Sequence, residues 1–257
     1  MQLTYSSSER GDLYREGKRQ ASDTRLDVDQ ITLRIGHAFQ WGRRPAYVYA
    51  QVARSRVDPG GSLQAVDANT GIGDLGLMLA TWPYVNREAE RYAGVAAYLS
   101  LPTGSYDPLK TVGVNTNAGQ NRFAGALQAG YGQRLRGPLA WMIAGDVAWF
   151  GDNGAYFGPN PTEETLSQRP IVSTQTALTY SVNHWASLGL SYFYNTGGET
   201  RLGQSGWDNR INLHRYGANA QVRLPFGRLT IEYGGDITTD SGLLEEARWA
   251  VRLTSIF

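Results

Sequence analysis

The sequence contains no cysteine, which excludes disulfide bonds and thiol chemistry. It has only three histidines, and they are not clustered as metal ligands would be. No apolar run reaches the roughly 18 to 20 residues that a membrane-spanning helix needs, so any spanning segments must be strands. The first residues, Met1-Gln-Leu-Thr-Tyr5, lack the basic and apolar regions of a secretory signal peptide. We therefore expect no metal, no cofactor, and a processed or recombinant mature form of the chain.

An excess of charge of one sign is also missing, with 24 basic against 23 acidic residues, so the chain has no signature of nucleic-acid binding. What the sequence does contain is 31 glycines, 15 tyrosines and 7 tryptophans. Glycine suits strands that bend and pack closely, while Tyr and Trp favour the interfaces between membrane and water. No linker or shift in composition divides the chain, which predicts a single domain over residues 1–257.

The carboxy-terminal segment, residues 247–257, alternates in character with the period of a β-strand. Trp249, Val251, Leu253 and Phe257 fall on one face, and the other face carries two arginines. This pattern is typical of the last strand of a bacterial outer-membrane β-barrel, in which the apolar face meets lipid. We expect Phe257 to act as the assembly signal that the barrel-assembly machinery recognises. An amphipathic edge strand of a soluble barrel is the alternative.

Ten further segments alternate in the same way, and no convincing helical period interrupts them. These segments are residues 25–41, 46–57, 71–82, 91–101, 122–135, 138–150, 171–182, 184–195, 213–224 and 228–238. Together with the terminal segment they make an odd number, whereas bacterial single-chain barrels usually have an even one. Residues 2–7 supply a weak twelfth strand, although residues 1–24 could instead form a tail in the lumen. The predicted fold class is all-β, a closed antiparallel transmembrane barrel of twelve strands.

The lengths of the connections orient this barrel. If Phe257 lies at the periplasmic rim, residues 42–45, 83–90, 136–138, 181–184 and 225–227 form periplasmic turns, and all of these are short. The remaining links are long and polar, as extracellular loops are expected to be. They comprise residues 58–70, 102–121, 151–169 and 196–212.

Charged residues of the predicted strands should line the lumen, because a midplane arginine that faces lipid costs about 2 to 4 kcal/mol. The predicted lumen-lining residues are Arg34, Asp74, Arg122, Arg134, Asp146, Arg215, Arg223, Arg228, Glu232, Asp236, Arg248 and Arg252. They would either form a closed core of paired charges or line a wet conduit. We favour a narrow conduit because twelve strands enclose more space than eight. Eight arginines against four acidic residues in this set indicate a mild preference for anions.

Two junctions between loops and strands resemble a known family. These are Thr70-Gly-Ile-Gly-Asp-Leu75 and Leu101-Pro-Thr-Gly-Ser-Tyr-Asp-Pro108, the latter followed by Asn121-Arg-Phe123. Both resemble the outer-membrane family associated with the meta pathway of phenol degradation, in which a Gly-x-Gly-Asp strand start and a Leu-Pro-Thr-Gly-x-Tyr-Asp loop recur. The resemblance implies a channel that admits aromatic and other hydrophobic small molecules.

The loop residues Tyr106, Asp107, Tyr156 and Phe157 are candidates for a constriction or for the place where solutes first bind. A turn at the outer rim is an equally good interpretation of Tyr106 and Asp107, because Pro102 ends a strand and Gly104 permits a turn. Asp74 lies beside two glycines, and we expect it to form an ion pair with Arg122.

Catalysis finds little support, because His37, His184 and His214 have no evident Ser or Asp partner. We therefore predict a monomeric outer-membrane barrel that is not an enzyme. It would act as a passive channel for small hydrophobic or aromatic solutes, with outer-membrane lipid around it. The alternatives are a small porin for anionic hydrophilic solutes, a barrel enzyme that acts on lipid, and a structural barrel without flux.

Overall fold

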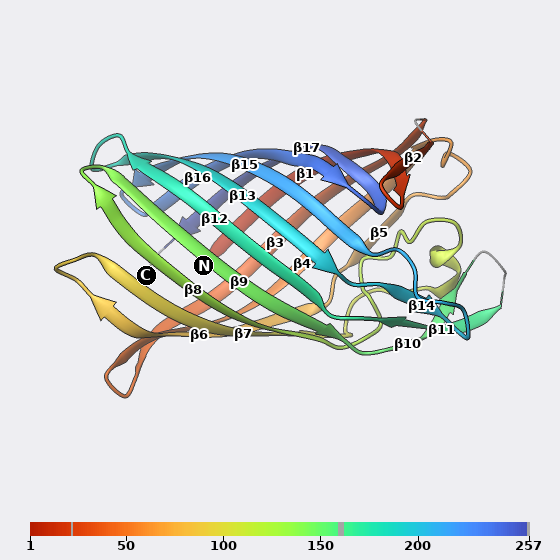
Figure 1. Cartoon of the computed structure of the whole chain (residues 1–257), viewed down its shortest axis with the longest axis horizontal. Helices are drawn as coiled ribbons and strands as arrows, with labels where there is room; N and C mark the ends of the chain where they lie inside the picture. The colour runs from red at the N-terminus through yellow and green to blue at the C-terminus, as the bar shows by residue number, and fades with distance from the viewer. Residues whose placement is uncertain (22, 159–161, 256–257) are drawn as a thin grey trace.

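The computed structural model describes residues 1–21, 23–158 and 162–255, and most of these residues are in β-strands (Figure 1). Twelve antiparallel strands form a closed sheet, because β1 pairs with both β3 and β17. The barrel strands are β1 (Gln2–Arg15), β3 (Thr24–Trp41), β4 (Arg44–Gly61), β6 (Leu75–Asn86), β7 (Arg91–Leu101), β8 (Ala124–Arg136), β9 (Leu139–Phe150), β12 (Ile171–Ser181), β13 (Ala186–Gly197), β15 (Ile211–Leu224), β16 (Gly227–Thr239) and β17 (Gly242–Ser255). The predicted fold class is thus confirmed. The predicted assembly signal, Phe257, lies outside the described residues.

The remaining elements extend the barrel at one end. Strand β2 (Lys18–Ala21) pairs with β1, and β5 (Asn69–Ile72) pairs with β4. A separate small sheet consists of β10 (Asn153–Phe157), β11 (Glu163–Gln168) and β14 (Thr200–Leu202). A short 3-10 helix, η1 (Pro108–Thr111), lies in the connection between β7 and β8. None of the described residues belongs to a helix that is long and apolar enough to cross a membrane.

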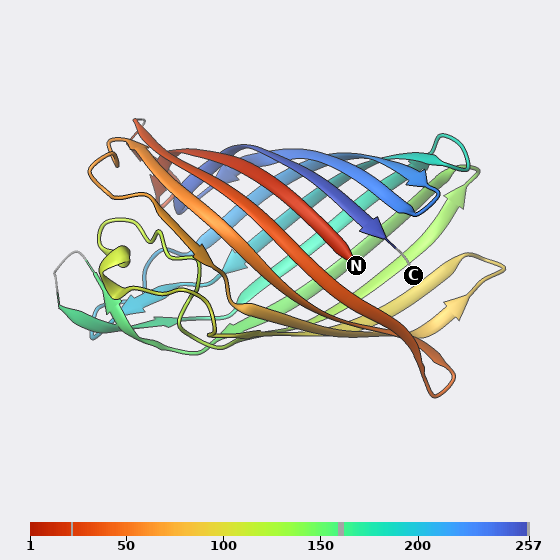
Figure 2. The same cartoon turned by 180° about the vertical axis from the view of Figure 1, so that it is seen from behind.

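The connections at the two ends of the barrel differ in length, as Figures 1 and 2 show. The β3–β4, β6–β7, β8–β9, β12–β13 and β15–β16 turns all lie at the end toward which β17 runs and from which β1 starts. The longer connections and the small sheet lie at the opposite end. We call these the periplasmic and extracellular ends, by analogy with outer-membrane barrels.

The amino-terminal segment is a full strand of the wall. Residues Gln2 to Arg10 pair with Arg34 to Leu26 of β3, and Gln2 also pairs with Thr254 of β17. This strand is longer than the predicted residues 2–7, because its hydrogen bonding continues beyond the apolar region. Its outward residues Leu3 and Tyr5 are 47% and 49% exposed, and polar residues follow them. The short apolar stretch explains why the sequence signal for this strand was weak.

Large apolar side chains cover the outside of the barrel. On β17, Trp249, Val251 and Leu253 are 57%, 45% and 38% exposed, and Ala250, one residue away, is buried. Aromatic rings lie within this apolar surface, for example Tyr233, which contacts both Tyr216 and Trp249, and Trp141, which contacts Tyr131. An exposed apolar surface that includes aromatic rings is the surface that a bilayer requires.

Candidate functional site: a two-sided lumen under an extracellular cover

The inner surface of the barrel has two unlike halves. Pairing registers place the charged residues Arg215, Glu232 and Arg252 on the inner face of β15, β16 and β17. On the opposite side, the inner face of β4, β6 and β7 carries Tyr49, Met78 and other apolar or aromatic side chains. The lumen is therefore amphipathic across its width.

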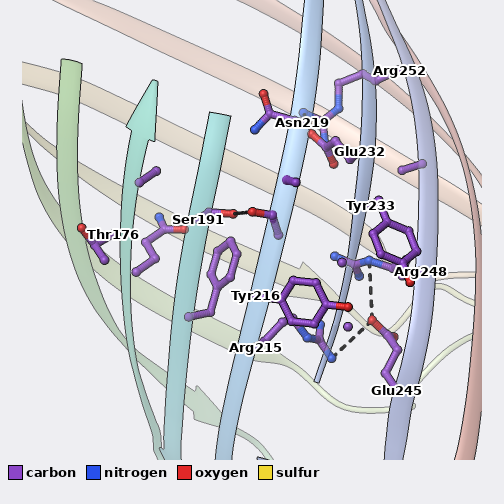
Figure 3. A pocket seen from close by; sticks show the side chains of 18 of the residues that line it. Thr176, Ser191, Arg215, Tyr216, Asn219, Glu232, Tyr233, Glu245, Arg248 and Arg252 are labelled. Atoms are coloured by element: carbon purple, nitrogen blue, oxygen red, sulfur yellow. Dashed lines mark hydrogen bonds and ion pairs between the residues drawn. The ribbon is translucent and has the colours of Figure 1, made fainter. Parts of the chain in front are cut away.

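The charged half centres on Glu245, whose side chain is 2% exposed. Three arginines surround its carboxylate: Arg10 and Arg215 at 3.5 Å and Arg248 at 3.7 Å. Figure 3 shows Arg215 and Arg248 on either side of Glu245. Asp236 lies beside them, accepts a hydrogen bond of 2.8 Å from the backbone N–H of Glu245, and pairs with Arg215 at 2.7 Å. This group of three arginines and two carboxylates comes from four consecutive strands of the wall, and we call it the arginine cluster.

Further charges continue this wall toward the periplasmic end. Arg252 pairs with Glu232 at 3.0 Å, on the periplasmic side of the arginine cluster. Arg223 and Arg228 face each other across β15 and β16 near the periplasmic turn, and both line a small cavity with His184. Two directly opposed arginines repel each other, so they favour an anion or water between them.

The apolar half surrounds a cavity of about 500 Å³. Its lining includes Tyr47, Met78, Ala80, Trp82 and Tyr98. The phenol of Tyr98 donates a 3.0 Å hydrogen bond to Gln128, which in turn donates one of 3.3 Å to Asp146. Asp146 therefore faces the lumen as the end of a polar chain that crosses an otherwise apolar wall.

Arg34 joins the two halves. Its guanidinium donates two hydrogen bonds to the side-chain oxygen of Gln51, at 3.0 and 2.7 Å, and lies 4.1 Å from the centre of the Tyr49 ring. Stacking on an aromatic ring and bidentate donation are both typical of arginine. This contact holds the Tyr49 ring on the inner wall.

The connection between β7 and β8, residues 102–123, folds over the extracellular end of the barrel (Figures 1 and 2). Asp74 holds it there: its two carboxylate oxygens accept hydrogen bonds from the backbone N–H groups of Gly104 and Gln120, each at 2.9 Å. Gly104 and Gly119 touch at this point, and a Cβ on either would lie 2.8 Å from backbone atoms of the facing segment. Glycine is therefore required for the two arms of this connection to meet. We call residues 102–123 the cover.

The cover is also tied to the small extracellular sheet. The phenol of Tyr106 donates a 2.7 Å hydrogen bond to the Ala155 carbonyl and accepts one of 2.8 Å from the Asn153 amide. The Thr111 hydroxyl donates to the Phe157 carbonyl and accepts from its N–H, both at 2.9 Å. Asp107 is exposed and caps η1 by accepting from the N–H of Leu109. Tyr106 therefore anchors the cover to β10, and Asp107 has a local role in its fold.

Arg122 lies at the root of the cover. Its guanidinium donates to the side chain of Gln168 at 2.5 Å and lies 4.9 Å from the centre of the Phe150 ring. Burial lowers the pKa of Arg122 and raises the pKa of Tyr106 and of Tyr156. The expected ion pair between Asp74 and Arg122 is wrong: Asp74 bonds backbone N–H groups, while Arg122 bonds glutamine side chains.

The predicted site residues fall into three groups. Arg34, Asp146, Arg215, Arg223, Glu232, Asp236, Arg248 and Arg252 project from the inner face of wall strands. Asp74 lies just before β6 and fastens the cover, Arg122 lies at the root of the cover, and Arg134 is held at the periplasmic turns by Glu90 and the Gly137 carbonyl. Tyr156 and Phe157 are in β10, outside the wall.

The sequence analysis did not predict that Glu245 faces the lumen, nor that one half of the lumen is apolar and aromatic. Counting by twos from the carboxy terminus puts Glu245 on the lipid face, but an extra residue in β17 shifts the register, because Glu9 pairs with Ala247 and Arg10 with Glu245. This bulge turns Glu245 inward. In β4 both faces carry apolar residues, so alternation alone could not tell that Tyr47 and Tyr49 face inward. The one available signal was the charge of Glu245 itself, at a position where the alternation predicts an apolar residue that faces lipid.

The histidines lie outside the lumen or at its edge. His37 stacks on Phe39 on the outer face of β3, and His184 lies in a periplasmic turn. His214 contacts the Tyr192 phenol at 2.6 Å through Nδ1, also on the outer face.

A model of the family named for the MetA-pathway of phenol degradation matches residues 11–252 of the chain. Among solved structures, the chain is similar to an outer-membrane channel from Pseudomonas putida F1, with 25% sequence identity, a TM-score of 0.92, and coverage of 100% of this chain and 94% of that chain. No curated protein matches significantly.

Two more distant structures share the fold alone. The β domain of the Bordetella autotransporter BrkA is 13% identical with a TM-score of 0.60, over 100% of this chain and 98% of that chain. The KdgM porin, solved in complex with disordered oligogalacturonate, is 9% identical with a TM-score of 0.51, over 100% and 99% of the two chains. The molecule is therefore a channel-like or porin-like barrel of the outer-membrane type.

Proposed function

Because the chain belongs to the family named for the MetA-pathway of phenol degradation, we propose that it is a passive channel through which small hydrophobic or aromatic molecules cross the outer membrane. The main observation in support of this proposal is the apolar half of the lumen. A wall that includes Tyr47, Met78, Ala80, Trp82 and Tyr98 surrounds a cavity of about 500 Å³ and is a good surface for an aromatic ring.

The apolar wall would lower the barrier to an aromatic solute by removing part of its surface from water. Covering about 100 Å² of apolar surface is worth roughly 2.5 kcal/mol. A gain of this size concentrates the solute in the lumen and still allows it to leave, as conduction requires. The charged half keeps the rest of the passage wet, so the solute moves along one wall of a hydrated lumen.

The cover would set how solutes arrive. Tyr106 and Tyr156 stand with Phe150 and Arg122 around the extracellular end, where an incoming ring first meets aromatic side chains. Hydrogen bonds hold the cover in place, and two of them depend on the single residue Asp74, so local opening at this point is the step that we expect to admit solute.

We infer transport and not catalysis, because the histidines of the chain lack the surroundings of a nucleophile. Among the described residues, His214 contacts a tyrosine on the outer face, and His37 stacks on a phenylalanine there. A serine hydrolase needs a histidine that is oriented by a carboxylate and lies beside a serine. We further propose that the barrel functions as a monomer surrounded by outer-membrane lipid, and that the assembly machinery recognises its last strand.

The second candidate is a small porin for anionic hydrophilic solutes, and the arginine wall favours it. Arg10, Arg215, Arg248 and Arg252 would attract any anion, whether or not it carries an apolar part. Only a comparison of aromatic with hydrophilic solutes separates these two functions.

Uptake by intact cells of a Gram-negative host that lacks general porins tests the proposal. The channel should raise the initial uptake rate of labelled phenol several-fold and leave that of labelled arabinose nearly unchanged. Ala96→Trp should abolish most of the gain, because Ala96 lines the apolar cavity. The matched control is Ala97→Trp, whose side chain points to the other face of β7, toward lipid.

Equal gains for phenol and arabinose would contradict the proposal and favour a general porin. A phenol gain that survives Ala96→Trp would show that the solute does not pass along this wall. Both variants must first show the heat-dependent gel mobility of a folded barrel, so that loss of uptake reports a blocked lumen.

A further inference from the structure

The polar and apolar halves of the lumen share a boundary. The cavity beside the arginine cluster is about 500 Å³ in volume and is lined by Arg215, Arg248 and Arg252 on one side and by Met142, Ala177 and Phe193 on another. Met142 and Gln175 also line the apolar cavity of about 500 Å³. The two cavities therefore meet at Met142 and Gln175, and a molecule placed there touches arginine at one end and apolar side chains at the other.

The charges of the arginine cluster are layered. Its carboxylates lie underneath, with the side chains of Glu245 and Asp236 only 2% and 3% exposed. Its guanidinium groups lie above them, with Arg10 and Arg248 exposed by 40% and 47%. With three arginines and two carboxylates the cluster has a formal charge of +1, and the face that a solute meets is the positive one.

The guanidinium groups also have donors to spare. The distances from Glu245 to its three arginines, 3.5 to 3.7 Å, exceed the roughly 2.7 to 2.9 Å of a charge-assisted hydrogen bond. Neither Glu245 oxygen accepts a side-chain hydrogen bond from any described residue. Glu245 thus lowers the repulsion among the arginines without occupying their N–H groups, which can still bind a carboxylate in the lumen.

We propose that this junction recognises small aromatic acids, with the carboxylate on Arg248 and the ring against Met142 and Phe193. This inference rests on the proposed channel function and names the solute class that the channel favours. Guanidinium forks match carboxylates in geometry, and the neighbouring apolar side chains cover the ring. An aromatic cation would meet an exposed arginine layer, and a sugar acid would leave the apolar side uncovered.

Benzoate is the probe for this site, measured with the purified channel in planar bilayers. Benzoate on one side and acetate on the other give a reversal potential, from which the permeability ratio of the two anions follows. Benzoate should be the more permeant ion although it is larger. Benzoate should also reduce the chloride current at lower concentration than benzamide, its neutral isostere.

Variants locate the effect. Arg248→Gln should weaken the block by benzoate about tenfold or more, since a hydrogen bond to a charged group is lost. Met142→Gln should bring the permeability ratio of benzoate to acetate toward one. Arg54→Gln is the matched control: it removes the same charge from β4, where Arg54 pairs with the outward-facing Ile31.

The outcomes separate this inference from the channel function. If benzoate is no more permeant than acetate while benzamide still reduces the current, the aromatic-acid site is refuted and a channel for neutral aromatics stands. If neither aromatic compound affects the current, both proposals fall. A preference for benzoate that Arg248→Gln does not change would place the binding elsewhere and overturn the assignment.

Discussion

Replacing Asp74 with alanine should weaken the attachment of the cover to the barrel. The carboxylate accepts backbone hydrogen bonds from Gly104 and Gln120, both at 2.9 Å, one from each arm of the cover. Hydrogen bonds to a charged group each contribute about 1.5 to 3 kcal/mol, and the partial exposure of Asp74 to water reduces this. We expect a loss of about 2 to 3 kcal/mol, which multiplies the open population of the cover by roughly 30 to 150.

Hydrogen exchange followed by mass spectrometry measures this directly. In Asp74→Ala, amides of residues 102–123 should exchange faster by that factor, while the wall strands exchange as before. Asp74→Asn should give an intermediate rate, because the amide keeps one acceptor oxygen. Asp107→Ala is the control, since Asp107 caps η1 without contacting Asp74. Unchanged exchange in Asp74→Ala would refute the idea that this carboxylate fastens the cover.

Two further predictions concern charge. Arg248→Ala combined with Arg252→Ala should shift the reversal potential in a salt gradient toward cation selectivity, because two positive charges leave the lumen; an unchanged potential would refute their place in the conducting path. Burial raises the pKa of Tyr106 and of Tyr156. The stability that these two neutral phenols contribute to the fold is therefore fully present below about pH 10, the ordinary tyrosine pKa, and is lost as the pH rises through their raised pKa values. A pH titration followed by tyrosinate absorbance measures this. Compared with the parent protein, Tyr106→Phe and Tyr156→Phe should lose the part of the absorbance that develops at the highest pH; if the two phenols titrate together with the other tyrosines, they are not buried.

The sequence predicts the wall strands well because a barrel imposes one rule on each of them. Every wall residue faces either lipid or lumen, so the period of two persists along segments such as 213–224 and 228–238. The rule gave the strand number once the amino-terminal strand was included. It also predicted which connections share an end of the barrel, since the five turns expected to be periplasmic lie at one end.

The same rule fails where the pleat is interrupted. The bulge at β17 moves Glu245 from the expected lipid face into the arginine cluster, and the sequence marks it only by a charge at a position where alternation predicts an apolar residue. Alternation also carries no information in β4, where Val48 and Tyr49 are both apolar although they face opposite sides. Contacts of the cover, such as Tyr106 with Ala155, join residues far apart in sequence and depend on the closed barrel to bring them together.

Cysteine labelling of neighbouring residues in β17 tests the barrel and its wet lumen most directly, because the natural chain has no cysteine to interfere. Arg248→Cys should react with a charged, membrane-impermeant thiol reagent and change the single-channel current. Trp249→Cys should be protected by lipid and leave the current unchanged. The reverse pattern, or equal reaction at both positions, would contradict a barrel whose arginines meet water inside and whose tryptophan meets the membrane.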